Sequence, residues 1–174
     1  ARYTSELANG LGNLASRATA MVVRYCDGVL PEPGDYTNAD RSLQDALIEA
    51  AAKADSAMLA LDFAGGIAAI RAFVEAVNLY VTEQEPWKLA KDPAQRVRLQ
   101  TVLYTMSEAL RAIAVMYHPV MPAAMTSLWG QLGALPHLGE VGAQDVREVE
   151  RWGKLPAGAV MTKGAALFPR IEEK

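Results

Sequence analysis

The sequence predicts an all-α protein: a helical bundle of about five helices, followed by an irregular C-terminal tail. Two observations lead to this prediction. Apolar residues recur in steps of three or four over four long segments, and turn residues gather where these segments end. Each segment is therefore expected to form an amphipathic helix, and long helices joined by short links bury their apolar faces against one another.

The four helical segments are defined by their apolar stripes. The first stripe runs from Leu7 to Tyr25, and the second from Leu43 to Leu61. The third runs from Ile67 to Val81, and the fourth from Leu99 to Tyr117. Because an α-helix has about 3.6 residues per turn, each stripe occupies one helix face. We expect these four faces to form the core.

Capping and turn residues agree with these limits. Thr37 and Asp40 have the spacing of a capping box that begins the second helix. Asp92 and Pro93 are an N-cap and first-turn pair at the start of the fourth. The stretch 27–36 holds two prolines and two glycines, which is typical of a loop between the first two helices.

The regular pattern ends in the last quarter of the chain. Pro119 and Pro122 end the fourth helix and allow a short fifth one, at roughly 122–132. Nearly half of the 13 glycines lie after residue 132, so the tail is expected to be mostly irregular. A weak helix is expected within it, near 143–152. We therefore divide the chain into a bundle of residues 1–132 and a C-terminal extension of residues 133–174.

Composition narrows the class of protein. The chain has 174 residues, 51% of them hydrophobic, which is enough for one domain with a sizeable core. Its 17 basic and 20 acidic residues exclude nucleic-acid binding by broad phosphate neutralisation, so any such contact must be local. The single cysteine, Cys26, fits a reducing compartment. We see neither a signal peptide nor an apolar run of about 20 residues, and a start at Ala1 leads us to expect a segment of a larger protein.

Patterns for catalysis and metal binding are absent from the sequence. His118 and His137 have no glutamate three residues earlier, and the chain has neither a cysteine pair for zinc nor a Gly-rich nucleotide loop. We expect His118 to be structural and Cys26 to be an inert, partly buried thiol. No nucleophile has an obvious base, so we expect no catalytic residue in this segment.

A polar stripe on the first predicted helix is a candidate recognition face. Asn13 and Arg17 lie one turn apart, and Arg24 continues the stripe after two further turns. An amide and a guanidinium offer the donors and acceptors that read a base edge, and Arg24 could reach a phosphate. The same spacing is also found on an ordinary solvated face or in an interhelical hydrogen bond.

A second candidate is the turn around Pro86 and Trp87. Pro86 ends the third helix, so the indole of Trp87 stands at a junction where it could stack on an unpaired base. Residues 86–111 hold five basic and two acidic residues, and we infer that Lys88 and Lys91 contact phosphates. The alternative for Trp87 is a capping anchor against the core.

Four segments carry a resemblance to a known family. They are Leu7 to Arg17, Asn78 to Lys91, Pro119 to Gly133 and Leu167 to Glu172. Together they resemble the C-terminal anticodon-binding domain of bacterial methionyl-tRNA synthetases over nearly the whole chain. The turn with Trp87 is fairly specific to that group, whereas the proline-opened helix is shared with the leucyl, valyl, isoleucyl and cysteinyl enzymes.

The resemblance implies a site. In that family the matching tryptophan stacks on the wobble cytosine of the CAU anticodon, and the matching asparagine and arginine contact anticodon bases. These roles would fall to Trp87, Asn13 and Arg17, with Pro86 shaping the turn. Thr82 departs from the pattern, because some bacterial members carry an aspartate there, and the role of that acid does not transfer to a hydroxyl.

The resemblance also implies a parent enzyme. It would be a cytoplasmic, ATP-dependent methionine–tRNA ligase, a class I aminoacyl-tRNA synthetase. Its partners would be initiator and elongator methionine tRNA and its own catalytic domain, not a membrane. ATP, with Mg²⁺, would bind that domain, whose His-Ile-Gly-His and Lys-Met-Ser-Lys-Ser motifs this chain lacks. No cofactor or metal is expected in the segment itself.

The extension of residues 133–174 would then pack back on the bundle or on that catalytic domain. In isolation we expect it to expose the following apolar residues: Leu135, Leu138, Val141, Val160, Leu167 and Phe168. Two other functions remain open: the anticodon-binding domain of another class I synthetase, or a helical interaction scaffold without an RNA role. Convergence of Asn13, Arg17 and Trp87 on one exposed patch would discriminate against the scaffold.

Overall fold

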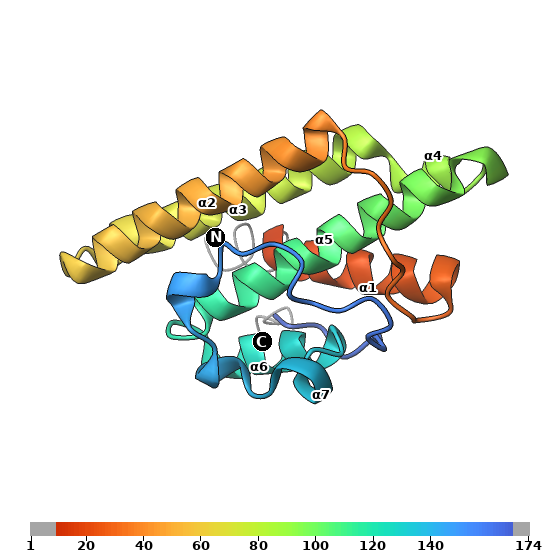
Figure 1. The fold of residues 1–174 in the computed structure, drawn as a ribbon. Coiled ribbons are helices and arrows are strands. Elements are labelled where there is room, and N and C mark those ends of the chain that lie inside the picture. The colour runs from red at the N-terminus through yellow and green to blue at the C-terminus, as the bar shows by residue number, and fades with distance from the viewer. Residues whose placement is uncertain (1–9, 169–174) are drawn as a thin grey trace, which may run out of the picture.

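The computed structural model describes residues 10–168 and shows an all-α fold (Figure 1). Leu7 and the residues after Phe168 lie outside the described residues. The helices are α1 (Asn13–Cys26), α2 (Asn38–Leu59), α3 (Phe63–Gln84), α4 (Pro86–Leu89), α5 (Arg96–Tyr117), α6 (Pro122–Gln131) and α7 (Leu135–Leu138). Short 3₁₀ turns are η2 (Pro93–Gln95), η3 (Val141–Ala143) and η4 (Val146–Glu148). Within residues 10–168 the β-structure is limited to one isolated bridge between Val29 and Val160.

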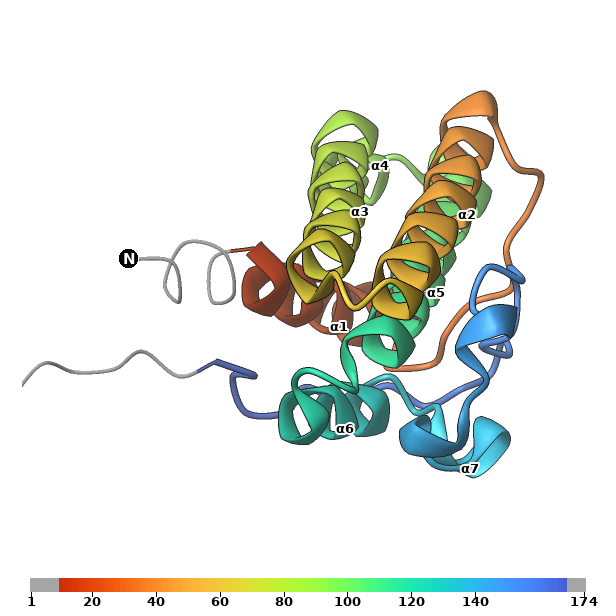
Figure 2. The ribbon, with the colours of Figure 1, turned by 90° about the vertical axis from the view of Figure 1, so that its left-hand side faces the viewer.

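The central element is α5. The antiparallel hairpin of α2 and α3 covers one of its sides, and α1, α6 and the extension cover the others (Figures 1 and 2). Every residue of α5 from Thr101 to Tyr117 is buried. A single apolar stripe predicts burial on one face only, so α5 is enclosed far more completely than its periodicity indicates.

The predicted caps are present. Thr37 and Asp40 form the capping box of α2, with the Thr37 N–H donating to Asp40 Oδ2 over 2.7 Å. Asp92 accepts from the Ala94 N–H at 3.0 Å, but the helix it begins is the 3₁₀ turn η2, and α5 itself starts at Arg96. The loop expected at 27–36 is irregular apart from its single bridge.

The α2–α3 hairpin corrects two stripe positions. Because α2 ends at Leu59, Leu61 lies in the connecting turn with a positive φ of 60°, and its side chain is exposed. Ile67 is also exposed, in the second turn of α3 and close to the connecting turn. The buried face of α3 starts at Gly66 and Ile70.

The expected helix near 143–152 is wrong. Residues 146–148 form only the short turn η4, which begins with the Asp145 carboxylate accepting from the Arg147 N–H at 2.9 Å. The carbonyls of Val149 and Arg151 accept hydrogen bonds from the Arg111 guanidinium, at 3.0 and 3.2 Å. Arg111 on α5 therefore bonds to backbone carbonyls that would otherwise accept the hydrogen bonds of a continuing helix.

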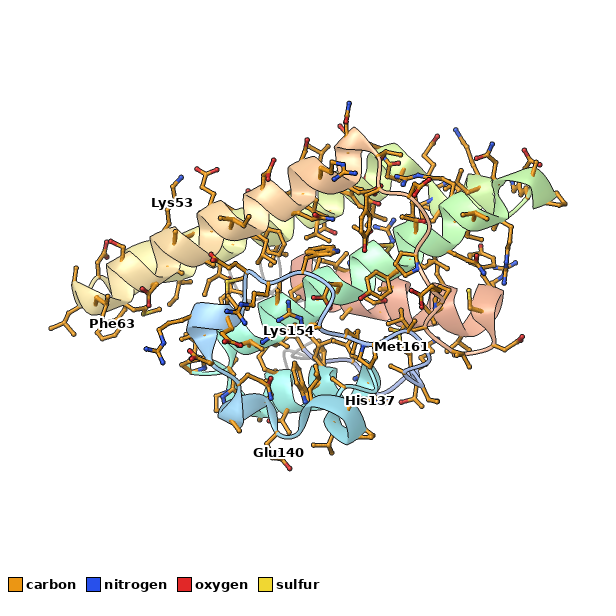
Figure 3. All side chains as sticks on the ribbon, viewed as in Figure 1. Lys53, Phe63, His137, Glu140, Lys154 and Met161 are labelled. Atoms are coloured by element: carbon orange, nitrogen blue, oxygen red, sulfur yellow. The ribbon has the colours of Figure 1, made fainter. Side chains whose placement is uncertain are left out.

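The extension packs along α5. Figure 3 labels Lys154 and Met161 of the extension, which contact Glu108 and Ser107 on α5 respectively. The Tyr104 hydroxyl donates to the Leu155 carbonyl over 2.7 Å, and Leu155 is fully buried. Leu30 and Ala159 join the extension to the loop after α1, with an N–H to carbonyl distance of 2.9 Å.

The expected exposure of the extension is only partly correct. Leu135 and Val160 are exposed. Leu138 and Leu167 are half-buried against the core. Val141 and Phe168 are buried, because the extension folds onto α5 and α6 rather than away from them.

One helical segment among the described residues, Phe63–Leu89, is long and apolar enough to span a membrane by length and composition. This finding differs from the expectation that no apolar run is long enough to span a bilayer. In the fold, one face of this segment is buried through Phe73, Val74 and Val77, and it packs on α2 and α5. A core helix passes the same test of length and composition, and that is the position that α3 occupies.

Candidate nucleic-acid interface

The α1 stripe is exposed. The opposite face of the helix is buried through Leu14, Ala18 and Val22, so α1 presents Asn13, Arg17 and Arg24 to solvent. Arg24 lies over the ring of Tyr25, with 5.6 Å from the guanidinium carbon to the ring centroid. The apolar residues of α1 thus fix the direction in which its polar stripe points.

The tryptophan turn has the geometry that Pro86 predicts. The last residue of α3 is Gln84, Glu85 adopts a left-handed conformation with φ 47°, and α4 begins with Pro86 at its first turn. Pro86 is buried, and Trp87 is half-buried against the core. Trp87 is therefore both a packing anchor and a partly accessible ring.

Arg17 and Trp87 meet. The Arg17 guanidinium carbon lies 5.6 Å from the centroid of the Trp87 ring, within the range of a cation–π contact. These residues are far apart in the sequence, and α1 and the turn after α3 bring them together. The fold therefore joins the two candidate recognition features, with Asn13 one helical turn from Arg17 on the same stripe.

The basic residues around the turn have different surroundings. Lys88 forms an exposed ion pair with Glu85 at 2.7 Å. Lys91 is exposed and has no acidic partner among the described residues. Arg96 donates to the Tyr25 carbonyl at 2.8 Å and joins the end of α1 to the start of α5.

The positive balance of residues 86–111 overstates the charge at the surface. Arg111 is buried and paired with Glu108, at 2.8 Å. Arg98 is paired with the buried carboxylate of Asp40, at 2.6 Å. The accessible cations of this region are therefore Lys88, Lys91 and Arg96, since a cation neutralised inside the core cannot reach a phosphate.

A polar network behind the tryptophan turn was missed by the sequence reasoning. Asp40 accepts from both terminal nitrogens of Arg98, at 2.6 and 3.1 Å, and from the Tyr80 hydroxyl at 2.5 Å. Arg98 also donates to Gln84 Oε1 over 2.5 Å. The only sequence signal was the capping box, which identifies Asp40 as a helix cap but not as the partner of residues on α3 and α5.

The electrostatics of this network favour a charged pair. Burial alone would raise the pKa of Asp40, but hydrogen bonds from Arg98, Tyr80 and Thr37 outweigh burial and hold that pKa below its ordinary value. Burial and the hydrogen bond to Asp40 raise the pKa of Tyr80 far above its ordinary range. Asp40 is therefore ionised at neutral pH, and Tyr80 keeps the proton that it donates.

Thr82 and Cys26 both interact with other groups of the protein fold, and neither belongs to the α1 stripe or to the tryptophan turn. Thr82 donates from its hydroxyl to the Asn78 carbonyl in its own helix, at 3.0 Å. Burial raises the pKa of the Cys26 thiol, although the nearby Arg96 acts in the opposite direction. Cys26 is therefore a protonated thiol at neutral pH. Over residues 10–168, no group of three or more His, Cys, Asp and Glu side chains could hold a metal ion.

Solved structures with the same fold identify the class of protein. The apo form of Mycobacterium tuberculosis methionyl-tRNA synthetase matches with a TM-score of 0.88 and 30% identity, over 99% of this chain and 34% of that chain. The same enzyme bound by methionyl-adenylate matches with a TM-score of 0.86, over 97% of this chain and 32% of that chain. The fold is thus that of a helical domain of an aminoacyl-tRNA synthetase.

Sequence comparison identifies the family within that class. The profile for the anticodon binding domain of methionyl tRNA ligase matches residues 30–174, and the chain belongs to this family. The methionine–tRNA ligase of Streptomyces coelicolor is 54% identical over all of this chain and 33% of its own length. That of Caldanaerobacter subterraneus is 37% identical over 98% of this chain and 26% of its own length. The chain therefore spans between a quarter and a third of these relatives.

Proposed function

We propose that this chain reads the CAU anticodon of methionine tRNA, as the recognition module of an ATP-dependent methionine–tRNA ligase. The observation that carries the proposal is the contact between Arg17 and Trp87, at 5.6 Å. It joins an exposed stripe of base-reading side chains to an aromatic ring inside a family of anticodon-binding domains. A Trp87 ring buried and turned away from Arg17 would instead favour an interaction scaffold without an RNA role.

Stacking on Trp87 supplies the first part of the mechanism. A base stacked on an aromatic side chain contributes about 1–3 kcal/mol. The contact with Arg17 is worth about 0.5–1 kcal/mol at an exposed site, so an unstacked wobble cytosine can displace the guanidinium from the ring where both need the same face. Pro86, buried at the first turn of α4, holds the ring in place for this exchange.

Hydrogen bonding supplies the discrimination. The amide of Asn13 and the guanidinium of Arg17 would pair with base edges of the anticodon. A wrong base would leave these groups without partners in a water-poor interface, which costs about 1–3 kcal/mol for each unsatisfied group. Asn13 and Arg17 would therefore discriminate against a wrong base because it leaves their polar groups without hydrogen bonds.

Phosphate contacts would add affinity without selectivity. Arg24 extends the α1 stripe, and Lys88 and Lys91 flank the tryptophan turn. The ion pair between Lys88 and Glu85 is exposed, at 64% and 39% of the two side chains, so breaking it to reach a phosphate costs little. With an overall charge of −3, these contacts must stay local to the anticodon.

The rest of the ligase would lie outside this chain. Amino-acid activation, with ATP and Mg²⁺, would belong to a catalytic domain in the remaining length that the relatives have and this chain does not. Initiator and elongator methionine tRNA, which share CAU, would both be partners, in the cytoplasm and without a membrane contact.

Binding to two RNA stem-loops tests the proposal. One carries CAU, and in the other the wobble cytosine is replaced by uracil, both at the same salt concentration. We expect the chain to prefer CAU, and Trp87→Ala to weaken CAU binding by about 1–3 kcal/mol and to abolish the preference.

The matched control is Trp152→Ala, which removes another half-buried indole. Trp152 lies on the extension, and its indole N–H donates to the Tyr36 hydroxyl at 3.3 Å. This control should retain the preference for CAU. Equal binding of both stem-loops by the unmodified chain would contradict anticodon reading and favour the scaffold.

A further inference from the structure

The polar network behind the tryptophan turn has a direct covalent route to Trp87. Gln84 is the last residue of α3, and Trp87 follows three residues later. Between them stand Glu85, fixed in a left-handed conformation, and Pro86, whose ring fixes its own φ. The intervening backbone therefore has little freedom, so the position of the Gln84 side chain constrains the position of the indole.

Arg98 is the fixed point of this network. Its guanidinium donates twice to Asp40, which is fully buried and is held in turn by Tyr80 and Thr37. A bidentate arginine–carboxylate pair sets the direction of the guanidinium as well as its distance. The third bond of Arg98 goes to Gln84, so the end of α3 is attached to a group that is held from α2 and α5.

We propose that Arg98 and Gln84 are positioning residues for anticodon reading. Arg98 holds Gln84, and Gln84 holds the end of α3 so that Trp87 meets the wobble base at the correct angle. The inference rests on the proposed function, and it adds two residues that are not expected to touch the RNA. Neither residue belongs to the α1 stripe or to the exposed cations.

The chemistry allows this role to be separated from simple stabilisation. The pair between Arg98 and Asp40 joins α5 to α2, and its loss would weaken the bundle as a whole. The bond between Arg98 and Gln84 can be removed alone, because Gln84 lies at a helix end and its side chain makes no other hydrogen bond among the described residues. Gln84→Ala is therefore the informative substitution.

The first readout is the indole N–H cross-peak of Trp87 in an ¹⁵N-labelled chain, assigned through Trp87→Phe. We expect Gln84→Ala to shift or broaden this peak. The indole peak of Trp129 should stay in place, because Trp129 lies on α6, which packs on α5 and η3, and its indole N–H donates to the Gly139 carbonyl.

The second readout is affinity for the CAU stem-loop. We expect Gln84→Ala to lower it about tenfold, within the range found for residues that act on a ligand through another residue. The matched control is Gln100→Ala, another half-buried glutamine, on α5 and without a side-chain hydrogen bond among the described residues. Gln100→Ala should leave both the affinity and the Trp87 peak unchanged.

Arg98→Lys adds a conservative test. A lysine keeps the charge opposite Asp40, but its single ammonium nitrogen lacks the planar fork with which the two terminal nitrogens of Arg98 reach both Asp40 and Gln84. We therefore expect this variant to remain folded and to reproduce the Trp87 shift and the affinity loss of Gln84→Ala. A wild-type Trp87 peak in folded Arg98→Lys would overturn the role of Arg98.

A double-mutant cycle decides whether Gln84 acts through the ring. In a Trp87→Ala background, Gln84→Ala should cause no further loss of affinity. Additive losses would overturn the positioning role while leaving the stacking role of Trp87 intact. If Trp87→Ala itself bound CAU normally, the proposed function would fail, and the positioning role would fail with it.

Discussion

Helix α5 carries two buried ion pairs with different partners, and their difference separates recognition from stability. Near its start, Arg98 pairs with Asp40 on α2, and the arginine side chain remains 18% exposed. In its second half, Arg111 pairs with Glu108 in the same helix, and this arginine is only 2% exposed. Arg98 of the first pair also bonds to Gln84, next to the tryptophan turn, and Glu108 of the second pair accepts hydrogen bonds from the C-terminal extension.

The second pair is more completely satisfied. The Glu108 carboxylate accepts from Arg111 and from the backbone N–H groups of Gly153, Lys154 and Leu155, at 2.9 to 3.1 Å for the backbone bonds. Arg111 in turn donates to two carbonyls of the extension. This pair fixes a segment that has no long helix of its own. We therefore expect the second pair to dominate stability and the first to matter more for RNA binding.

Removing the extension should have the largest effect. A chain ending at residue 132 would expose Tyr104 and leave the buried charges of Glu108 and Arg111 without their partners in the extension. We expect this chain to lose cooperative unfolding, a loss on the order of the 5–15 kcal/mol that a whole domain has. Urea titrations followed by circular dichroism should differ sharply between this chain and the 174-residue chain, whereas similar curves would show that the bundle folds alone.

Among single substitutions in the two ion pairs, Glu108→Gln should lower the free energy of unfolding the most. It removes the charge that balances Arg111 inside the core, and breaking a buried pair on one side costs about 3–5 kcal/mol. The measurement is the free energy of unfolding in urea. The fraction that remains folded should still prefer CAU, since Glu108 lies away from the tryptophan turn. If folded protein lost this preference, the Glu108–Arg111 pair and the tryptophan turn would be coupled.

Asp40→Asn should cost less, about 2 kcal/mol, because Arg98 keeps some contact with water after losing its partner. Its pH dependence has a defined sign. The folded state holds the pKa of Asp40 below its ordinary value, so the stabilisation is present above about pH 4 and is lost as the pH falls through the folded pKa.

Thermal unfolding between pH 2 and 7 therefore checks the role of Asp40. The unmodified chain should lose more stability than Asp40→Asn in the acidic part of this range, and the two should run parallel above it. An equal acid dependence in both proteins would mean that Asp40 is not the group whose protonation matters.

Lys91→Ala should have the smallest effect. The side chain is exposed and has no acidic partner among the described residues, so stability should change by less than about 0.5 kcal/mol. CAU affinity should become less dependent on salt, with the slope of log K against log salt reduced by about 0.7 for one phosphate contact. An unchanged slope would remove Lys91 from the interface.

The sequence was sufficient for the parts of the fold that depend on local patterns. Stripe spacing predicted the long helices, Thr37 and Asp40 predicted the start of α2, and Pro86 predicted the break before Trp87. These features follow from helix periodicity and capping, which act over a few residues. The likeness of the site to a known family also depended on such short segments.

Contacts between distant segments could not be predicted in this way. The α5 stripe marks one buried face, but Glu108 and Arg111 lie on another, which the extension covers. Arg98 has its charged partner, Asp40, 58 residues away, so its local sequence pattern is that of an arginine in water and the positive balance around the turn was overestimated. The approach of Arg17 to Trp87 depends on tertiary packing for the same reason.

Titration of the CAU stem-loop into the chain labelled with ¹⁵N at tryptophan tests most directly whether Trp87 reads the anticodon. Bound RNA should move the indole N–H peak of Trp87 strongly and leave the peaks of Trp129 and Trp152 in place. The stem-loop with the wobble cytosine replaced should move the Trp87 peak less at equal saturation. Saturable binding of the CAU stem-loop with an unmoved Trp87 peak would contradict anticodon reading at this ring.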